Sequence, residues 1–330
     1  MKYYIGLDQG GTKTAAIVCG TNGRILGAGY EAGLVDVYFN DTDGQYIKRI
    51  KSACEKACAQ AGIKLPDISA VCGGLNGADW DFEYPILAKK LAAGLGIEDV
   101  IVLNDCVAAL RGGTDELECG VVCAGSGLNI AVKRHDGEKI IYGYFINDAH
   151  QGAGALGTAA LRKIMESYIG ICGHTALTRL ILEYTGHDNA EKLLMSITSG
   201  QYRLEPKVLA PLVLKAYVQG DKETVSIVNP FAEEIAMYVT AGIRRLEISN
   251  NNMPIVFSGS VFKGDGLMLG DKIFSHITKS RPNMRMIYPR YEPVCGAALT
   301  LLDREFGGVV PDTVKENFDK TAAGHGLLWG

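Results

Sequence analysis

The feature that most constrains this chain is a short unit that occurs twice, 114 residues apart. The first copy alternates β-prone runs with turn residues, which predicts three strands joined by two turns. In order, these are strand Tyr3–Leu7, glycine-rich turn Asp8–Lys13, strand Thr14–Cys19, turn Asn22-Gly23 and strand Arg24–Tyr30. We therefore expect a β-meander with a polar loop between its first two strands.

The second copy repeats the special positions of the first at a constant offset. The matching pairs are Gly11 with Gly125, Thr12 with Ser126, Val18 with Val132, Asn22 with Asp136, Gly23 with Gly137, and Gly29-Tyr30 with Gly143-Tyr144. Turn positions that match as a set predict a duplicated fold. Coincidence is the alternative, because the chain contains 41 glycines.

The other segments alternate strands with helices, which predicts an α/β fold whose ligands bind beyond the carboxyl ends of parallel strands. Further strands are expected at Asp67–Gly73, Val100–Leu103, Gly120–Cys123, Ile255–Phe257 and Met284–Tyr288. Helices are expected at Gly44–Ala61, from about Cys106, and at Ala155–Tyr168, Ala176–Tyr184, Lys207–Gln219, Glu223–Glu247 and Cys295–Phe306. The tail from Gly307 is less periodic, so we expect it either to pack loosely or to return to the first domain.

Composition limits the class of protein. A chain of 330 residues with 47% hydrophobic content can bury the cores of two domains. A net charge of −4 gives no overall basic field for nucleic acid. No run reaches the roughly 18 apolar residues of a membrane helix. Because Met1 leads directly into a strand-like run and not into a signal peptide, we expect a soluble, cytoplasmic protein.

Nine cysteines, an odd number, lie mostly among small apolar neighbours, as expected for reduced, buried thiols. Two pairs, Cys54/Cys58 and Cys119/Cys123, are four residues apart. Neither pair accompanies a C-x-x-C or His-Cys cluster, so the sequence does not favour a zinc or iron–sulfur site.

The loop Asp8–Thr14 has the residues of a phosphate-binding nest, because glycines let backbone amides approach an anion closely. Candidate phosphate-binding residues are Gly10, Gly11, Thr12, Lys13 and Thr14. Asp8 could hold Mg²⁺ through water, since Mg²⁺ in such sites keeps several waters and few carboxylates. The alternative is a tight hairpin with an exposed aspartate.

A second loop of the same kind, Ala124–Asn129, follows the expected strand Gly120–Cys123. Its candidate phosphate-binding residues are Gly125, Ser126 and Gly127. Two such nests facing one cleft could clamp a polyphosphate. The G-x-x-x-x-G-K-[ST] motif is absent, and the first loop leads into a strand instead of a helix, which excludes a P-loop and a Rossmann fingerprint.

Asp105 follows the expected strand Val100–Leu103 at the point where a helix begins. A kinase that acts on an alcohol needs a base to orient and deprotonate the hydroxyl, and an aspartate suffices for phosphoryl transfer. Asn104 and Asp105 are equally suited to cap the helix. Local sequence leaves both interpretations open.

Taken together, these motifs resemble the acetylglucosamine kinases and related enzymes grouped with the BadF/BadG ATPases, within the superfamily of actin, hexokinase and heat-shock chaperone ATPases. Five motifs occur in the family's order: Asp8–Thr14 (first phosphate loop), Leu103–Leu110 (catalytic aspartate), Ala124–Asn129 (second phosphate loop), Phe257–Lys263 (adenosine) and Pro293–Leu299 (last connecting helix). The resemblance implies two ribonuclease-H-like domains, residues 1–110 and 111–330, with MgATP in the cleft between them.

The resemblance also implies site residues. Gly259 and Ser260 would lie near the adenosine, and Asp105 would be the catalytic base. Candidate sugar-binding residues are Asn76, Asp79, Asn104, Asp105, His150 and Gln151. For Asn76 and Asp79, an ordinary turn is the alternative.

Three departures from the family pattern concern these sites. His150 and Gln151 replace an acidic pair that in many relatives helps to bind sugar hydroxyls, which implies an altered sugar pocket. Gln9 stands where a small residue is usual, and the 124–127 loop lacks a threonine.

The expected function is phosphorylation of the primary hydroxyl of an N-acetylated amino sugar, with N-acetylmuramic acid and glucosamine as alternatives. A homodimer is common in such relatives. Two other classes remain open: an ATPase that activates a dehydratase through a shared iron–sulfur cluster, which needs clustered cysteines, and a binding protein that keeps the fold without turnover.

Overall fold

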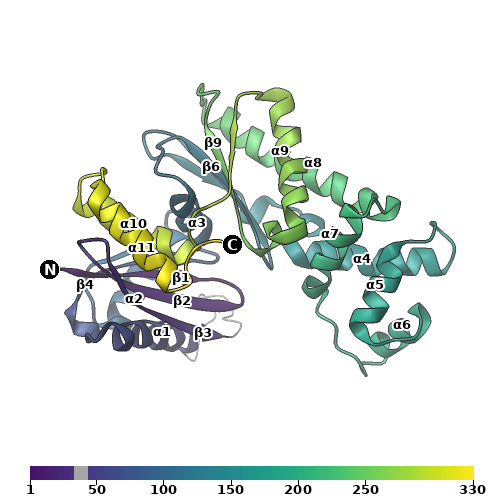
Figure 1. Cartoon of the computed structure of the whole chain (residues 1–330), viewed down its shortest axis with the longest axis horizontal. Helices are drawn as coiled ribbons and strands as arrows, with labels where there is room; N and C mark the ends of the chain where they lie inside the picture. Colours follow the sequence, from purple (N-terminus) through teal and green to yellow (C-terminus); the bar gives the residue numbers. More distant parts are fainter. Residues whose placement is uncertain (33–43) are drawn as a thin grey trace.

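Two five-stranded sheets form the framework of the molecule (Figure 1). The computed structural model describes residues 1–32 and 44–330. The first sheet has the order β3-β2-β1-β4-β5 and contains β1 (Tyr3–Gln9), β2 (Lys13–Gly20), β3 (Ile25–Ala32), β4 (Ile68–Leu75) and β5 (Val100–Asn104). The second has the order β10-β9-β6-β7-β8 and contains β6 (Cys119–Ala124), β7 (Leu128–Lys133), β8 (Lys139–Ile141), β9 (Pro254–Ser258) and β10 (Arg285–Ile287). The strand orders of the two sheets are equivalent when the second is read in reverse, so that β6, β7 and β8 correspond to β1, β2 and β3.

The two sheets also pair their strands in the same way. β1 is antiparallel to β2 and parallel to β4, and β6 is likewise antiparallel to β7 and parallel to β9. The predicted duplication and α/β class are confirmed. The copies differ after the third strand, because β8 ends at Ile141 and Gly143-Tyr144 lie in a 3-10 turn, η3 (Gly143–Phe145).

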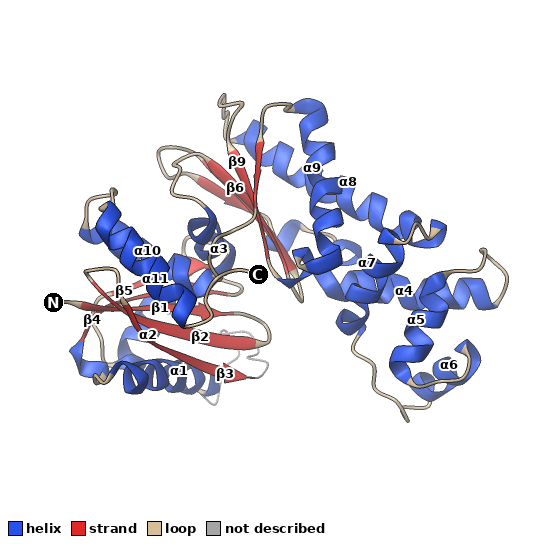
Figure 2. Ribbon diagram, viewed as in Figure 1, coloured by secondary structure: helices blue, strands red, loops and turns tan. Residues whose placement is uncertain are grey.

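The first sheet is covered by helices on both faces (Figure 2). Alternate residues of its strands point to opposite faces, as the pleat requires. Ile5, Leu7 and Val18 belong to the core formed with α1 (Gln45–Ala61) and α2 (Glu83–Leu95). Tyr4 and Ile17 belong to the opposite core.

That opposite core is closed by the last two helices, α10 (Pro293–Glu305) and α11 (Asp312–Gly324). The backbone N–H of Ile25 in β3 donates to Thr321 Oγ1 of α11 at 2.9 Å. Arg111 of α3 (Asp105–Gly113) forms a two-pronged ion pair with Asp303 of α10. The helices α10 and α11 therefore return to the first sheet, although they follow the second in sequence.

The second sheet carries a larger helical layer. Its helices are α4 (Gly152–Tyr168), α5 (Ala176–Thr185), α6 (Ala190–Thr198), α7 (Ala210–Val218), α8 (Lys222–Arg245) and α9 (Leu267–Ser280). The pair α5 and α6 lies farthest from the first sheet (Figure 1). The predicted helix Lys207–Gln219 is broken at its start, because Pro206 opens a 3-10 turn, η5 (Pro206–Leu209).

Within the described part of the chain, no helix combines the length and apolarity that crossing a membrane requires.

Candidate active site

A cavity of about 670 Å³ lies between the two sheets, at the carboxyl ends of β1, β4, β5, β6 and β9. Ligands in open α/β sheets bind at this edge. Fourteen of the predicted site residues line it: Asp8, Gly10, Gly11, Thr12, Lys13, Asn76, Asp79, Asp105, Gly125, Ser126, Gly127, Gln151, Gly259 and Ser260. The cavity therefore joins motifs that lie as far apart in sequence as β1 and β9.

The first loop is a tight turn between β1 and β2. Strand pairing ends at Gln9 opposite Thr14, and the N–H of Gly10 donates to the carbonyl of Lys13 at 3.0 Å. The amides of the turn are thereby held at the mouth of the cavity. A Cβ on Gly10 or Gly11 would meet no atom closer than 3.8 Å, so these glycines leave open space in which an anion could approach the backbone.

The second loop lies against the N-terminus of α4. The N–H groups of Ala153 and Gly154 donate to the carbonyls of Gly125 and Ser126 at 2.9 and 3.3 Å. Gly152 has φ 62°, and a Cβ there would lie 2.3 Å from the carbonyl oxygen of Gly127. Only glycine permits this close packing of loop and helix.

Gln151 lines the cavity, but its amide is occupied by backbone groups. Its Nε2 donates to the carbonyls of Gly143 and Ile146 at 3.2 and 3.1 Å, and its Oε1 accepts from the N–H of Leu128 at 3.3 Å. The side chain therefore connects the second loop to the segment beyond β8. This is a different task from the sugar contact that the sequence suggested.

Asp105 is the first residue of α3, and the helix cap falls on its neighbour. Asn104 is fully buried, and its Oδ1 accepts from the N–H of Cys106 at 2.9 Å. The Oδ1 of Asp105 accepts from the same N–H at 2.8 Å. Asn104 and Asp105 therefore share the cap amide, and the Asp105 carboxyl also lines the cavity.

Three carboxyl groups in the cavity, those of Asp8, Asp79 and Asp105, have a raised pKa. Burial and the nearby charge of Asp79 raise the pKa of Asp105 to about 7. Burial, followed by the charge of Asp105, raises the pKa of Asp8 to about 7, and Lys13 opposes this shift. A carboxylate with a pKa near neutrality is suited to accept a proton at physiological pH.

A polar network surrounds the Asp79 carboxyl at one side of the cavity. The Nδ2 of Asn129 donates to Asp79 Oδ1 and to Asn104 Oδ1, both at 3.2 Å. Asn104 Nδ2 also donates to Asp79 and to the carbonyl of Ala78. Burial raises the pKa of Asp79, while these hydrogen bonds lower it. The network joins residues from both sheets and fixes the orientation of the Asp79 carboxyl.

Gly259 brings the adenosine segment against the second loop. It has φ 103°, and a Cβ at this position would lie 2.2 Å from the carbonyl oxygen of Ala124. The segment continues into the 3-10 turn η6 (Ser260–Phe262). Gly259 and Ser260 therefore reach the cavity from β9, next to the end of β6.

Three predicted site residues do not line the cavity. Thr14 is 1% exposed within β2. Asn104 is buried behind the cavity wall, where it donates a hydrogen bond to Asp79 and accepts one from the N–H of Cys106 at the start of α3. His150 turns away toward α8, and its Nδ1 lies 3.0 Å from Glu234 Oε2. The assignment of His150 to sugar contact is corrected by this position, because its ring packs beside Phe231 in a separate cavity of about 270 Å³.

The cavity-lining residues that the sequence analysis did not assign to the site include Asn129, Gly143, Tyr144, Lys207 and Pro293. Asn129 and Pro293 belong to recognised motifs, and the 114-residue repeat contains Gly143 and Tyr144, so a signal existed for these four. Lys207 was placed in an expected helix, and nothing in the local sequence connects it to the site.

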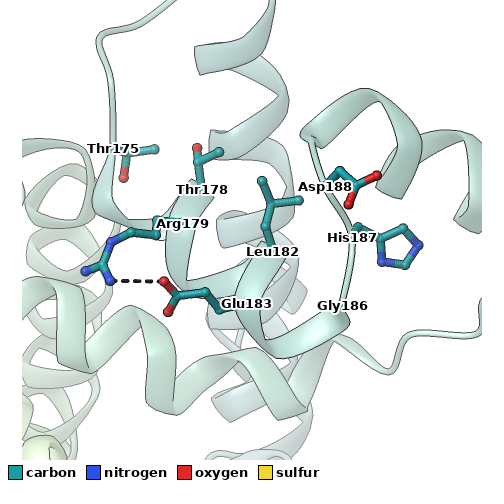
Figure 3. A pocket seen from close by; sticks show the side chains of 8 residues that line it. All are labelled: Thr175, Thr178, Arg179, Leu182, Glu183, Gly186, His187 and Asp188. Carbon is teal, nitrogen blue, oxygen red and sulfur yellow. Dashed lines mark hydrogen bonds and ion pairs between the residues drawn. The ribbon is translucent and has the colours of Figure 1, made fainter.

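A hollow of about 570 Å³ beside α5 is a weaker candidate (Figure 3). None of the predicted site residues lines it. Its charged groups are already paired: Arg179 with Glu183 at 3.1 Å, and Asp188 with Lys192 at 2.6 Å. Both glycine loops and the buried carboxyls of Asp8 and Asp105 line the cavity between the sheets instead, which makes that cavity the stronger candidate.

The two sheets and the cavity between them define a two-domain α/β protein with an actin-like fold. Residues 177–300 match the model of the BadF/BadG/BcrA/BcrD ATPase family. The chain is 25% identical over 304 residues to an N-acetylmuramic acid/N-acetylglucosamine kinase of Clostridium acetobutylicum, and the match covers 91% of this chain and 98% of that protein.

Solved structures show the same fold. A protein from Chromobacterium violaceum, provisionally designated an N-acetylglucosamine kinase, superposes with a TM-score of 0.69 at 23% identity, covering 91% of this chain and 99% of that chain. A ROK family glucokinase from Streptomyces griseus, in complex with glucose and AMPPNP, has a TM-score of 0.61 at 19% identity, covering 90% and 98%. The resemblance to the acetylglucosamine kinase and BadF/BadG group is confirmed.

Proposed function

We propose that this protein is an ATP-dependent kinase that phosphorylates a hydroxyl of an N-acetylglucosamine-like amino sugar, at the 6-position. The observation that carries the proposal is the position of the Asp105 carboxyl, which faces a cavity bounded by both glycine loops. A base next to a polyphosphate nest is the arrangement that phosphoryl transfer to an alcohol requires.

Each element has a task in this reaction. The two loops bind the phosphates through backbone amides, with Lys13 adding a positive charge. Asp105 orients the sugar hydroxyl and accepts its proton as the phosphoryl group is transferred. Asn76 and Asp79 bind the other sugar hydroxyls, while the Asn104–Asp79–Asn129 network keeps Asp79 in place.

Asp8 fits the role of a water-mediated Mg²⁺ ligand. It is 8% exposed and lines the cavity, and burial raises the pKa of its carboxyl, a shift that a nearby cation would oppose. A single carboxylate suits Mg²⁺, which keeps waters and phosphate oxygens as its other ligands. When bound, Mg²⁺ would neutralise charge on the phosphates.

Two classes of alternative are less well supported. An activating ATPase with a shared iron–sulfur cluster needs grouped cysteines, whereas seven of the nine cysteines are buried and all nine are free thiols. A binding protein without turnover would not need a near-neutral carboxyl at residue 105.

The direct test is ADP production in the presence of MgATP and a panel of sugars: N-acetylglucosamine, N-acetylmuramic acid, glucosamine and glucose. We expect turnover with an N-acetylated amino sugar to exceed turnover with glucose by at least about tenfold, the effect of one well-placed hydrogen bond to the acetamido group. Hydrolysis of ATP at the same rate with and without every sugar would reject the kinase assignment. Product phosphorylation at position 6 is read by phosphorus NMR.

Location and assembly belong to the same proposal. We place the protein in the cytoplasm, where ATP and reduced thiols coexist, and we propose a homodimer. Light scattering coupled to size-exclusion chromatography tests the assembly, with a mass of twice 35.4 kDa expected. A monomer at all concentrations would remove the homodimer without affecting the kinase proposal.

A further inference from the structure

Residues 326–329 lie across the connection between the two sheets. The chain passes from β10 to α10 through residues 288–292, and this connection runs antiparallel to the later segment. The N–H of Glu292 donates to the carbonyl of Leu327 at 2.9 Å, and the N–H of Trp329 donates to the carbonyl of Arg290 at 3.1 Å. Tyr291 and Leu328 form the antiparallel bridge between them. We call residues 326–329 the strap.

The strap is anchored in both cores. Leu327 is 1% exposed within the core that α10 and α11 form on the first sheet. Two residues later, Trp329 packs against the core of the second sheet. Its ring is stacked on Tyr288, with centroids 5.3 Å apart and an interplanar angle of 14°. A change in the relative position of the two sheets must therefore move one anchor against the other.

A line of charges connects the strap to the phosphate site. Lys263, which follows the adenosine turn η6, lies 5.3 Å from the centroid of the Trp329 ring. Its Nζ donates to Glu292 Oε1 at 2.8 Å. The other oxygen, Oε2, lies 4.0 Å from the Nζ of Lys13 in the first phosphate loop. Glu292 thus joins a lysine from each domain at the point where the chain crosses between them.

The two pairs of Glu292 differ in strength. The Lys13 pair is at the distance limit of an ion pair, and the Lys13 side chain is 53% exposed. Such a pair changes an equilibrium constant by about fivefold at most. A polyphosphate carries several negative charges, so it can draw Lys13 away. Glu292 then interacts with Lys263 alone, which changes the electric field that Glu292 and Lys263 produce at the Trp329 ring.

We propose that Glu292 is a positioning residue that couples phosphate binding at Lys13 to the strap, through Lys263 and Trp329. The inference rests on the proposed function, because it takes the first loop to bind a nucleotide phosphate. It extends that function by assigning a task to the connection 288–292 and to the strap, neither of which lines the cavity.

The fluorescence of Trp329 provides the test, because the chain contains only two tryptophans. In a Trp80→Phe background, Trp329 is the sole tryptophan. We expect AMPPNP with Mg²⁺ to change its emission, with a half-saturation that equals the dissociation constant measured by calorimetry. Adding Glu292→Gln should reduce the emission change at least twofold, while the dissociation constant stays within about fivefold. Lys263→Met should have the same effect, since it removes the link to the ring.

Glu316→Gln is the matched control. Glu316 belongs to α11 and pairs with Lys320 at 3.9 Å on the exposed face of that helix. This variant should keep the full emission change. An unchanged response in Glu292→Gln, a silent Trp329 despite calorimetric binding, or an equal loss in Glu316→Gln would each overturn the inference. The absence of any binding heat would instead reject the proposed nucleotide site, and the inference with it.

Discussion

Asp8 and Asp105 are the residues of the site whose burial most disfavours the charged carboxylate. Both carboxyls lie in the same cavity, and burial is the main cause of the raised pKa of each. A buried carboxylate loses hydration that its neighbours replace only in part. The amide N–H of Cys106 compensates Asp105 partly. The site is therefore less stable than it would be with neutral groups, and more reactive.

The pH dependence of sugar phosphorylation follows from this acidity. A base must be unprotonated to accept a proton, so with a pKa of about 7 for Asp105 we expect kcat/KM to rise with pH up to about 7 and then level off. Below that point it should fall about tenfold per pH unit, or faster if Asp8 titrates in the same range. Initial rates at saturating MgATP measure this. A profile that is flat across neutrality would show that no such base operates.

The same shift predicts that Asp105→Asn stabilises the fold. The pKa of Asp105 is raised from 3.8 to about 7 on folding, so the protonated form is favoured in the folded state and stability is lost as pH rises through this range. Asparagine removes that loss and can still accept the Cys106 N–H. At about pH 8 we expect the variant to gain about 2–4 kcal/mol in the free energy of unfolding, and less at about pH 5.

Urea unfolding at both pH values measures the difference. Asp115→Asn serves as control, because Asp115 is a surface residue paired with Lys315 at 3.0 Å, and its pKa is lowered by that contact. It should lose a little stability where Asp105→Asn gains. If Asp105→Asn lowered the free energy of unfolding equally at the two pH values, the charged Asp105 carboxylate would not destabilise the fold.

At the scale of elements, the glycine-rich turns hold the two domains' loops in place. Gly259 combines φ 103° with a close backbone neighbour, the Ala124 carbonyl oxygen, which would lie only 2.2 Å from a Cβ. Any side chain must therefore displace β9 or the second loop. We expect Gly259→Ala to lower the free energy of unfolding by about 2–4 kcal/mol and to weaken MgATP binding more than about tenfold.

Gly264→Ala is the control that introduces a side chain at a positive φ without the steric clash expected at Gly259. Gly264 also has a positive φ, 57°, but a Cβ there meets nothing within 4 Å. It should cost only about 1–2 kcal/mol, with MgATP affinity nearly unchanged. Calorimetric titration and thermal unfolding of both variants decide the matter. Equal effects on affinity would remove the special role of Gly259 at the second loop.

The sequence predicted elements well where turns constrain the chain and poorly where packing does. Both hairpins followed from glycine, asparagine and aspartate at fixed offsets, because those residues determine local backbone geometry. The helix α11 was not predicted. Its buried residues are Val314, Phe318 and Ala322, a narrow stripe in a polar segment, and only the first sheet gives that stripe a partner.

Side-chain direction limited the prediction of the site. The strand end predicted the position of Asp105 at the ligand edge of the sheet, and the family resemblance supplied its expected role as base. His150 and Gln151 follow no such rule, because their turn is oriented by α8 and by the second loop. One faces Glu234 and the other binds three backbone groups. The departures at 150 and 151 therefore alter the support of the site as well as its lining.

At the scale of the molecule, a duplicated hairpin produces a cleft with two related faces. Each copy ends its first strand in a glycine turn, and residues of both turns line the same cavity. The sequence left open whether the tail returns to the first domain. In the structure α10 and α11 cover the first sheet (Figure 1). The strap then crosses the connection between the domains, where Leu328 pairs with Tyr291.

The central claim is that Asp105 accepts the proton of an alcohol in a cleft that binds MgATP. The most direct test is the turnover of Asp105→Asn with its best sugar, measured together with its affinity for MgATP. We predict that kcat falls by about 10²–10⁴-fold while the dissociation constant of MgATP changes by no more than a few fold. Turnover within a few fold of the parent protein, in a variant that binds MgATP normally, would contradict the account.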